Sequence, residues 1–73
     1  MSMSKADKMW NSVRQNVILE DDEGKKYEGR IIACEKPDDN EEGEYAIYLT
    51  TVTGENWCLL EHEIVSLEIK QSN

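Results

Sequence analysis

The side chains of this chain best suited to chemistry are one histidine and two cysteines. His62 stands between Glu61 and Glu63, while Cys34 and Cys58 lie inside apolar stretches. Catalysis would need a base oriented beside a nucleophile, but adjacent residues of a strand point to opposite faces, so neither glutamate is expected to orient His62. Two cysteines with one histidine are also too few for a structural zinc site. The sequence therefore predicts no enzyme, no metal site and no cofactor.

The charge of the chain is strongly acidic. Its 73 residues include 16 acidic and 8 basic ones, which gives a net charge of −8. A surface of this sign repels nucleic-acid phosphates and suits a protein partner with a basic surface. The candidate nucleic-acid contacts are Lys25, Lys26, Arg30 and Asn40. RNA binding is thus a prediction that the charge disfavours.

The cysteines also bear on the cellular compartment. The first ten residues, MSMSKADKMW, contain no apolar run like that of a secretory signal, so two free thiols in a reducing compartment are expected. No stretch approaches the ~20 apolar residues of a membrane span. We expect a cytoplasmic protein that does not contact a membrane.

Short strands must position these side chains. Residues 4–15 begin with Ser-X-X-Asp and carry apolar residues at helical spacing, which predicts an N-terminal helix anchored by Trp10. Alternating apolar residues between turn signals predict five strands, at about 16–20, 26–35, 44–52, 55–61 and 63–69. Residues 35–44, of which six in ten are acidic, form an acidic loop. We expect a single domain over 1–73 that is mainly β, a small antiparallel barrel with a helix before it.

Two glycines mark the geometry of the predicted barrel. Gly24 follows Asp-Asp-Glu and is expected to supply the positive φ of a hairpin turn. Gly29 lies inside a strand, where glycine is typical of a bend or a bulge. The pattern predicts a long strand, bent at Gly29, that belongs to both halves of the barrel.

The segment VILEDDEGKKYEGRI, residues 17–31, resembles the first motif of the Sm and LSm family of small barrels. In that motif an apolar strand is followed by a turn glycine, an aromatic residue, a second glycine and an apolar residue, here Gly24, Tyr27, Gly29 and Ile31. The resemblance implies a five-stranded Sm-like barrel with an N-terminal helix. Other SH3-like and Tudor-like barrels share this glycine-aromatic-glycine spacing and stay open as alternatives.

The second motif of the Sm family is replaced in this chain. The family has an arginine and a glycine there, and the arginine helps to hold a nucleotide. The segment LLEHEIVSLEI places Glu61 and His62 at these positions. The resemblance therefore supports the barrel, while the reversed charge argues against the RNA site.

Subunit pairing is the main functional expectation. In Sm-like proteins the corresponding strands join neighbouring subunits into a ring, so the resemblance implies pairing through 44–52 and 55–61. These strands carry more apolar residues than one side of so small a sheet needs. The predicted subunit-interface residues are Tyr45, Ile47, Leu49, Trp57 and Leu59. We expect a non-enzymatic Sm-like scaffold or interaction protein that forms a homo-oligomer.

A monomeric SH3-like or Tudor-like module that recognises a basic or methylated peptide is the alternative. In this interpretation Tyr27, Tyr45, Tyr48 and Trp57 would form an aromatic cage around a methylated cation. The solution mass separates the two hypotheses, because a ring would weigh several times as much as one chain.

Overall fold

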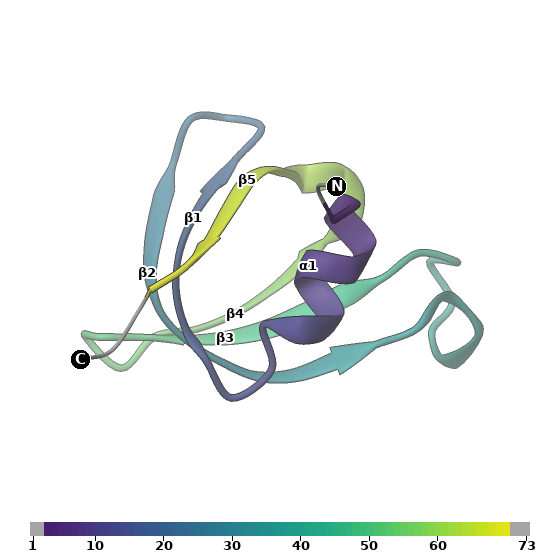
Figure 1. Ribbon diagram of the computed structural model, residues 1–73, viewed down its shortest axis with the longest axis horizontal. Coiled ribbons are helices and arrows are strands. Elements are labelled where there is room, and N and C mark those ends of the chain that lie inside the picture. Colours follow the sequence, from purple (N-terminus) through teal and green to yellow (C-terminus); the bar gives the residue numbers. More distant parts are fainter. Residues whose placement is uncertain (1–2, 71–73) are drawn as a thin grey trace.

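The computed structural model describes residues 3–70 as one five-stranded antiparallel sheet with a helix before it (Figure 1). The elements are α1 (Lys5–Asn11), β1 (Asn16–Asp21), β2 (Lys26–Glu35), β3 (Ala46–Thr51), β4 (Asn56–Leu60) and β5 (Ile64–Ile69), with 3₁₀ turns η1 (Pro37–Asp39) and η2 (Glu61–Glu63). The strand order is β4-β3-β2-β1-β5. The mainly β fold with its N-terminal helix is confirmed, and residues 1–2 and 71–73 of the predicted domain lie outside the described part. No helix within residues 3–70 is long and apolar enough to cross a membrane.

The helix α1 is shorter than predicted and is anchored by a different residue. Its start is as expected, since the Ser4 hydroxyl accepts a hydrogen bond from the Asp7 N–H at 3.1 Å. The helix ends at Asn11, so Val13 is not part of it. The apolar spacing from Trp10 to Val13, which predicted Trp10 as the anchor, therefore does not describe one face of the helix. The side chain of Met9 is fully buried, whereas Trp10 is 46% exposed. The prediction that Trp10 anchors the helix is wrong, and Met9 is the anchor.

The two glycines of the first hairpin have different roles. Gly24 has a φ of 83°, as the predicted turn requires. At Gly29 a Cβ atom would overlap the main-chain carbonyl oxygen of Thr50 on β3, so glycine is needed for the close approach of two backbones. The bulge lies further on, between Ile31 and Ala33, where the pairing of β2 with β3 shifts by one residue. The bulge turns Cys34 toward the core and leaves Ala33 exposed.

The core lies on the concave side of the curled sheet. It is formed by Met9, Val17, Leu19, Tyr27, Ile31, Ile47, Leu49, Leu59, Ile64 and Leu67. The ring centres of Tyr27 on β2 and Trp57 on β4 are 5.4 Å apart. Since β3 lies between these strands and neighbouring strands are about 4.8 Å apart, a flat sheet would hold β2 and β4 almost twice as far from each other, so the short ring distance reflects the curl. The Asp22 N–H also donates to the Glu63 carbonyl at 2.8 Å, which ties the end of β1 to η2. The sheet is strongly curled, but β4 and β5 remain its two edges, so a closed barrel is not shown.

Candidate functional site

The predicted subunit-interface side chains are divided between the core and the surface. Ile47, Leu49 and Leu59 are at most 5% exposed and belong to the core of the chain itself. This placement follows from the topology, since β3 is an inner strand between β2 and β4 and its apolar face lies under the curl. Tyr45 and Trp57 are half-buried against the same core. The expectation that Ile47, Leu49 and Leu59 offer apolar surface to a partner is therefore wrong, while Tyr45, Trp57 and the main chain of β4 stay partly accessible.

The pairing of β4 with β3 determines which main-chain groups of β4 are already used. The Thr51 N–H donates to the Glu55 carbonyl at 2.8 Å, and the Glu61 N–H donates to the Tyr45 carbonyl at 2.9 Å. In an antiparallel pair, every second residue of a strand bonds to the same neighbour. The odd-numbered residues of β4 therefore face β3, and the even-numbered ones direct their N–H and C=O groups away from the sheet.

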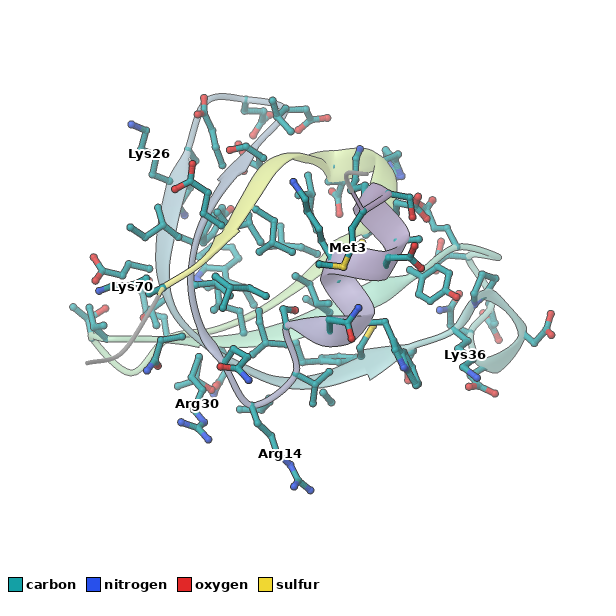
Figure 2. The ribbon with its side chains drawn as sticks, viewed as in Figure 1. Met3, Arg14, Lys26, Arg30, Lys36 and Lys70 are labelled. Atoms are coloured by element: carbon teal, nitrogen blue, oxygen red, sulfur yellow. The ribbon has the colours of Figure 1, made fainter. Side chains whose placement is uncertain are left out.

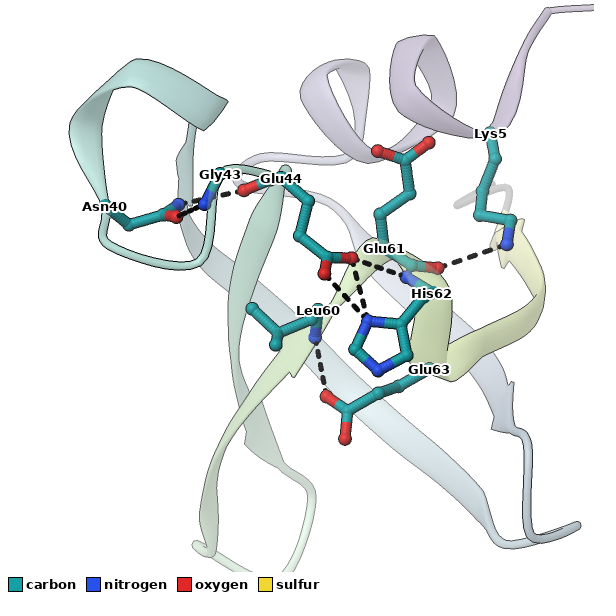
Figure 3. Close-up of polar contacts among 8 residues, drawn as sticks. All are labelled: Lys5, Asn40, Gly43, Glu44, Leu60, Glu61, His62 and Glu63. Atoms are coloured by element: carbon teal, nitrogen blue, oxygen red, sulfur yellow. Dashed lines mark hydrogen bonds and ion pairs between the residues drawn. The ribbon is translucent and has the colours of Figure 1, made fainter.

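The free edge of β4 consists of the main-chain groups of Asn56, Cys58 and Leu60. One of these groups is already used, because the Leu60 N–H donates to Oε1 of Glu63 at 2.9 Å (Figure 3). Both groups of Asn56, both groups of Cys58 and the Leu60 carbonyl remain open to an added strand. An edge of this kind is a template for pairing with another chain.

The other edge of the sheet, β5, is partly screened. The Lys70 N–H donates to the Asn16 carbonyl at 2.7 Å, so by the same alternation Leu67 and Ile69 direct their main-chain groups outward. Beside this edge a groove of about 440 Å³ runs toward α1 and is lined by Met3, Lys8, Leu67, Glu68 and Ile69. The helix α1 packs mainly against β5 and η2, which leaves the edge of β4 the more accessible of the two.

An acidic pocket of about 330 Å³ lies beside β4, on the face opposite the core. Its lining comes from the end of β2, the acidic loop, β3, β4 and η2. The residues are Glu35, Asn40, Glu42, Ala46, Tyr48, Cys58, Leu60 and Glu63. The Tyr48 hydroxyl donates to Glu35 at 3.0 Å, and this hydrogen bond raises the pKa of Tyr48 to about 12. Sequence reasoning missed this pocket because its carboxylates come from separate segments.

Asn40 fixes the shape of the acidic loop at the rim of this pocket. Its side-chain amide donates to the Glu44 carbonyl at 2.9 Å, and its amide oxygen accepts from the Gly43 N–H at 3.0 Å (Figure 3). The same amide also donates to the Lys36 carbonyl at 3.3 Å. All of these bonds are made within the loop. The side chain that was predicted as a nucleic-acid contact is thus used to hold the loop together.

His62 pairs with a residue that the sequence did not suggest. Its Nδ1 lies 2.9 and 2.8 Å from the two carboxylate oxygens of Glu44, and its main-chain N–H donates to Glu44 Oε1 at 2.8 Å (Figure 3). The hydrogen bond to Glu44 raises the pKa of His62, and the hydrogen bonds from His62, its main-chain N–H first, lower the pKa of Glu44. The pair joins the start of β3 to η2. No thiol or hydroxyl bonds to the imidazole within residues 3–70, so this histidine has a joining role in the geometry described.

The predicted nucleic-acid contacts are not gathered at one place. Lys26 begins β2 and Lys25 lies just before it, with its Nζ 3.8 Å from the centre of the Trp57 ring. Lys26 and Arg30 share the exposed face of β2, but Figure 2 shows them at separate places along the strand and pointing in different directions. Arg30 lies instead beside Arg14, whose N–H donates to the Ile31 carbonyl at 2.7 Å and whose φ is 71°. The structure thus places Arg30 and Asn40 apart from the two lysines and adds an arginine that the sequence did not single out.

Of the four residues predicted to form an aromatic cage, Tyr27 and Trp57 have their rings in contact. Tyr27 and Trp57 meet edge to face, and Lys25 places its ammonium 5.0 Å from the Tyr27 ring as well as over Trp57. Tyr48 lies in the acidic pocket on the opposite face, so it cannot join them. The place for a cation on this aromatic pair is therefore filled by a side chain of the chain itself.

Asp21 completes this cluster. The Tyr27 hydroxyl donates to Asp21 Oδ2 at 2.9 Å, and burial with this bond raises the pKa of Tyr27 to about 12. Burial also acts to raise the pKa of Asp21, but hydrogen bonds from the Lys25 N–H, the Tyr27 hydroxyl and the Glu23 N–H together hold it below its usual value. The cluster joins the first turn to the core, which is a structural role.

Comparison with models of known protein families, with characterised proteins and with solved structures finds no match for this chain.

Proposed function

We propose that the protein is a non-enzymatic interaction protein that self-associates by adding strands at the edges of its sheet. The observation that supports this proposal best is the free edge of β4, where Asn56 and Cys58 direct their N–H and C=O groups away from the sheet. An added strand satisfies such groups and provides affinity through main-chain hydrogen bonds. A chain of 73 residues has a small core, so added contacts contribute much to its stability.

The two edges determine the form of assembly. The pairing of β4 of one copy with β5 of the next is a head-to-tail contact, which gives a closed ring or an open chain. The pairing of β4 with β4 gives a two-fold dimer. We favour the head-to-tail contact because it uses both free edges and agrees with the ring that the Sm-like resemblance implies.

Charge affects both the assembly and the partner. The net charge of −8 makes two copies repel each other, but at physiological salt this repulsion is screened beyond ~8–10 Å. Self-association is therefore expected to strengthen as salt is added. RNA remains a less favoured partner, because the net charge is −8 and the candidate residues are spread along β2 and the acidic loop. Cys34 and Cys58 are both free thiols, which suits a reducing, cytoplasmic location.

Light scattering coupled to size exclusion tests the proposal. We expect a mass several times the 8.4 kDa of one chain at micromolar concentration. Proline at Cys58 removes one outward N–H without breaking the bonds to β3, so Cys58→Pro is expected to lower the mass, while Cys58→Ala keeps the N–H and leaves the mass unchanged. Proline at Ile47 would not be informative, because β3 is an inner strand and the fold itself would fail. A monomer at high micromolar concentration would remove the proposal.

A monomeric module that recognises a basic peptide is the second candidate. It is favoured by the acidic pocket beside the free edge of β4, which has no cationic side chain in its lining. Both candidates use the same strand edge and differ in what is added to it.

A further inference from the structure

We infer that the β4 edge and the acidic pocket form one docking site for an extended, basic segment of another protein, which adds to β4 and places an arginine or lysine side chain in the pocket. This inference rests on the strand addition of the proposed function, but it gives the β4 edge the basic segment of the second candidate as its occupant in place of β5 of another copy. Three features support it: the uncompensated charge of the pocket, its position against the edge, and the chemistry of its lining.

The carboxylates of the pocket are not neutralised by the chain. The ion pairs within residues 3–70 are His62 with Glu44 and Lys70 with Glu28, and neither involves a pocket residue. Glu35 and Glu63 each accept one hydrogen bond through a single oxygen, from the Tyr48 hydroxyl and the Leu60 N–H, so the other oxygen of each stays open.

Glu42, the third carboxylate of the pocket, is exposed on the acidic loop at the pocket rim. The three acids with open oxygens are therefore complementary to a single cationic side chain.

The edge strand and the pocket share residues. Cys58 directs its main-chain groups to the free edge, while its side chain lines the pocket together with that of Leu60. A strand added to β4 would lie about 4.8 Å away, with alternate side chains directed to the pocket face. A long side chain at one such position reaches the pocket mouth beside Cys58. One extended segment can thus bind the edge with its main chain and the pocket with a side chain.

The lining favours the side chain of a basic residue over a metal ion. Among residues 3–70, no three His, Cys, Asp or Glu side chains surround one point in the way that a metal ion requires. Leu60 offers apolar surface to an alkyl stem, and the Tyr48 ring offers a face to a guanidinium or ammonium group. Arginine suits the spread of carboxylates best, because its planar guanidinium has five N–H donors.

Fluorescence anisotropy with labelled nine-residue peptides tests the inference. The peptides are Thr- and Val-rich, so that they favour an extended chain, and differ only in a central Arg or Gln. We expect the Arg peptide to bind about 10-fold tighter than the Gln peptide at low salt, and the difference to shrink as salt is added. Glu42→Gln is expected to weaken the Arg peptide by about 3- to 5-fold and to leave the Gln peptide unchanged.

Glu41→Gln is the matched control, since it makes the same change in net charge at a neighbouring residue that does not line the pocket. It is expected to leave both peptides unchanged, and Cys58→Pro is expected to weaken both. Circular dichroism of each variant checks that the sheet is intact.

The outcomes separate this inference from the proposed function. Equal binding of the Arg and Gln peptides, with loss of both in Cys58→Pro, would overturn the basic pocket while strand addition stands. Assembly of the chain into an oligomer that binds neither peptide would also overturn it, and would identify a second copy as the partner. A monomer that binds neither peptide would remove both the inference and the proposed function.

Discussion

A comparison of Met9→Ala with Trp10→Ala tests directly whether Met9 anchors α1 to the core. Met9 is fully buried in the core, so Met9→Ala leaves a cavity as well as losing apolar contact. A buried Met→Ala change typically costs about 2–5 kcal/mol of unfolding free energy. Trp10 is 46% exposed, and its recognised partner is the Lys36 ammonium, 4.8 Å from the ring centre. Loss of such an exposed cation–π contact costs about 0.5–1 kcal/mol.

The size of this difference decides whether it can be measured. A domain of 73 residues has a total unfolding free energy of roughly 4–11 kcal/mol at about 0.05–0.15 kcal/mol per residue. Met9→Ala is therefore expected to remove a large fraction of the stability, and Trp10→Ala a small one. In thermal unfolding each 1 kcal/mol corresponds to about 4–8 °C for a domain of this size.

Urea unfolding followed by far-UV circular dichroism is the suitable assay, because the midpoint reports the loss of the sheet in both variants. We expect the midpoint of Met9→Ala to fall well below that of Trp10→Ala, with equal slopes in urea. The measurement is made at the lowest workable concentration, so that self-association does not add to stability. If Trp10→Ala proved at least as destabilising as Met9→Ala, the assignment of the anchor would be refuted.

Two further predictions follow from the geometry. Gly29→Ala is expected to destabilise the sheet by about 2 kcal/mol or more in urea unfolding, since its Cβ would overlap the Thr50 carbonyl; a cost near zero would contradict the close approach. Because the pKa of His62 is raised above its ordinary value of 6.5, its pair with Glu44 contributes stability fully below pH 6.5, and this contribution is lost as the pH rises through the raised pKa. The midpoint should therefore fall over that pH range more in the wild type than in His62→Gln, and NMR titration of His62 should give a pKa above 6.5; identical pH profiles would exclude the pair.

The regular elements were predictable because they have local signals. Gly24 and the turn residues before it predict the first hairpin, and the β-branched alternation predicts all five strands to within about two residues. The capping residue Ser4 correctly predicts the start of the helix. Each of these signals lies within a few residues of the feature it specifies.

Burial and the pocket depend on contacts between distant residues, so sequence reasoning did not find them. The helical spacing selected Trp10 because nothing in the sequence shows that the helix ends before Val13. The bulge after Ile31 changes the face of every following residue of β2, which alternation alone does not reveal. Glu35 and Glu63 line one pocket only because β2 pairs with β3 and β3 with β4, which places Glu35, Ala46 and Leu60 side by side.

The hydrogen bond from the Leu60 N–H to Glu63 limits how much of β4 a partner can use. Because that donor is occupied, only Asn56 and Cys58 have both their N–H and their C=O free for a partner. A single added strand therefore gains only a few main-chain hydrogen bonds. One such contact is weak, and the last contact of a ring forms within an assembly at a high effective concentration. If the chain forms the proposed ring, its assembly is therefore expected to be steeply cooperative in protein concentration, with few intermediates between the single chain and the ring.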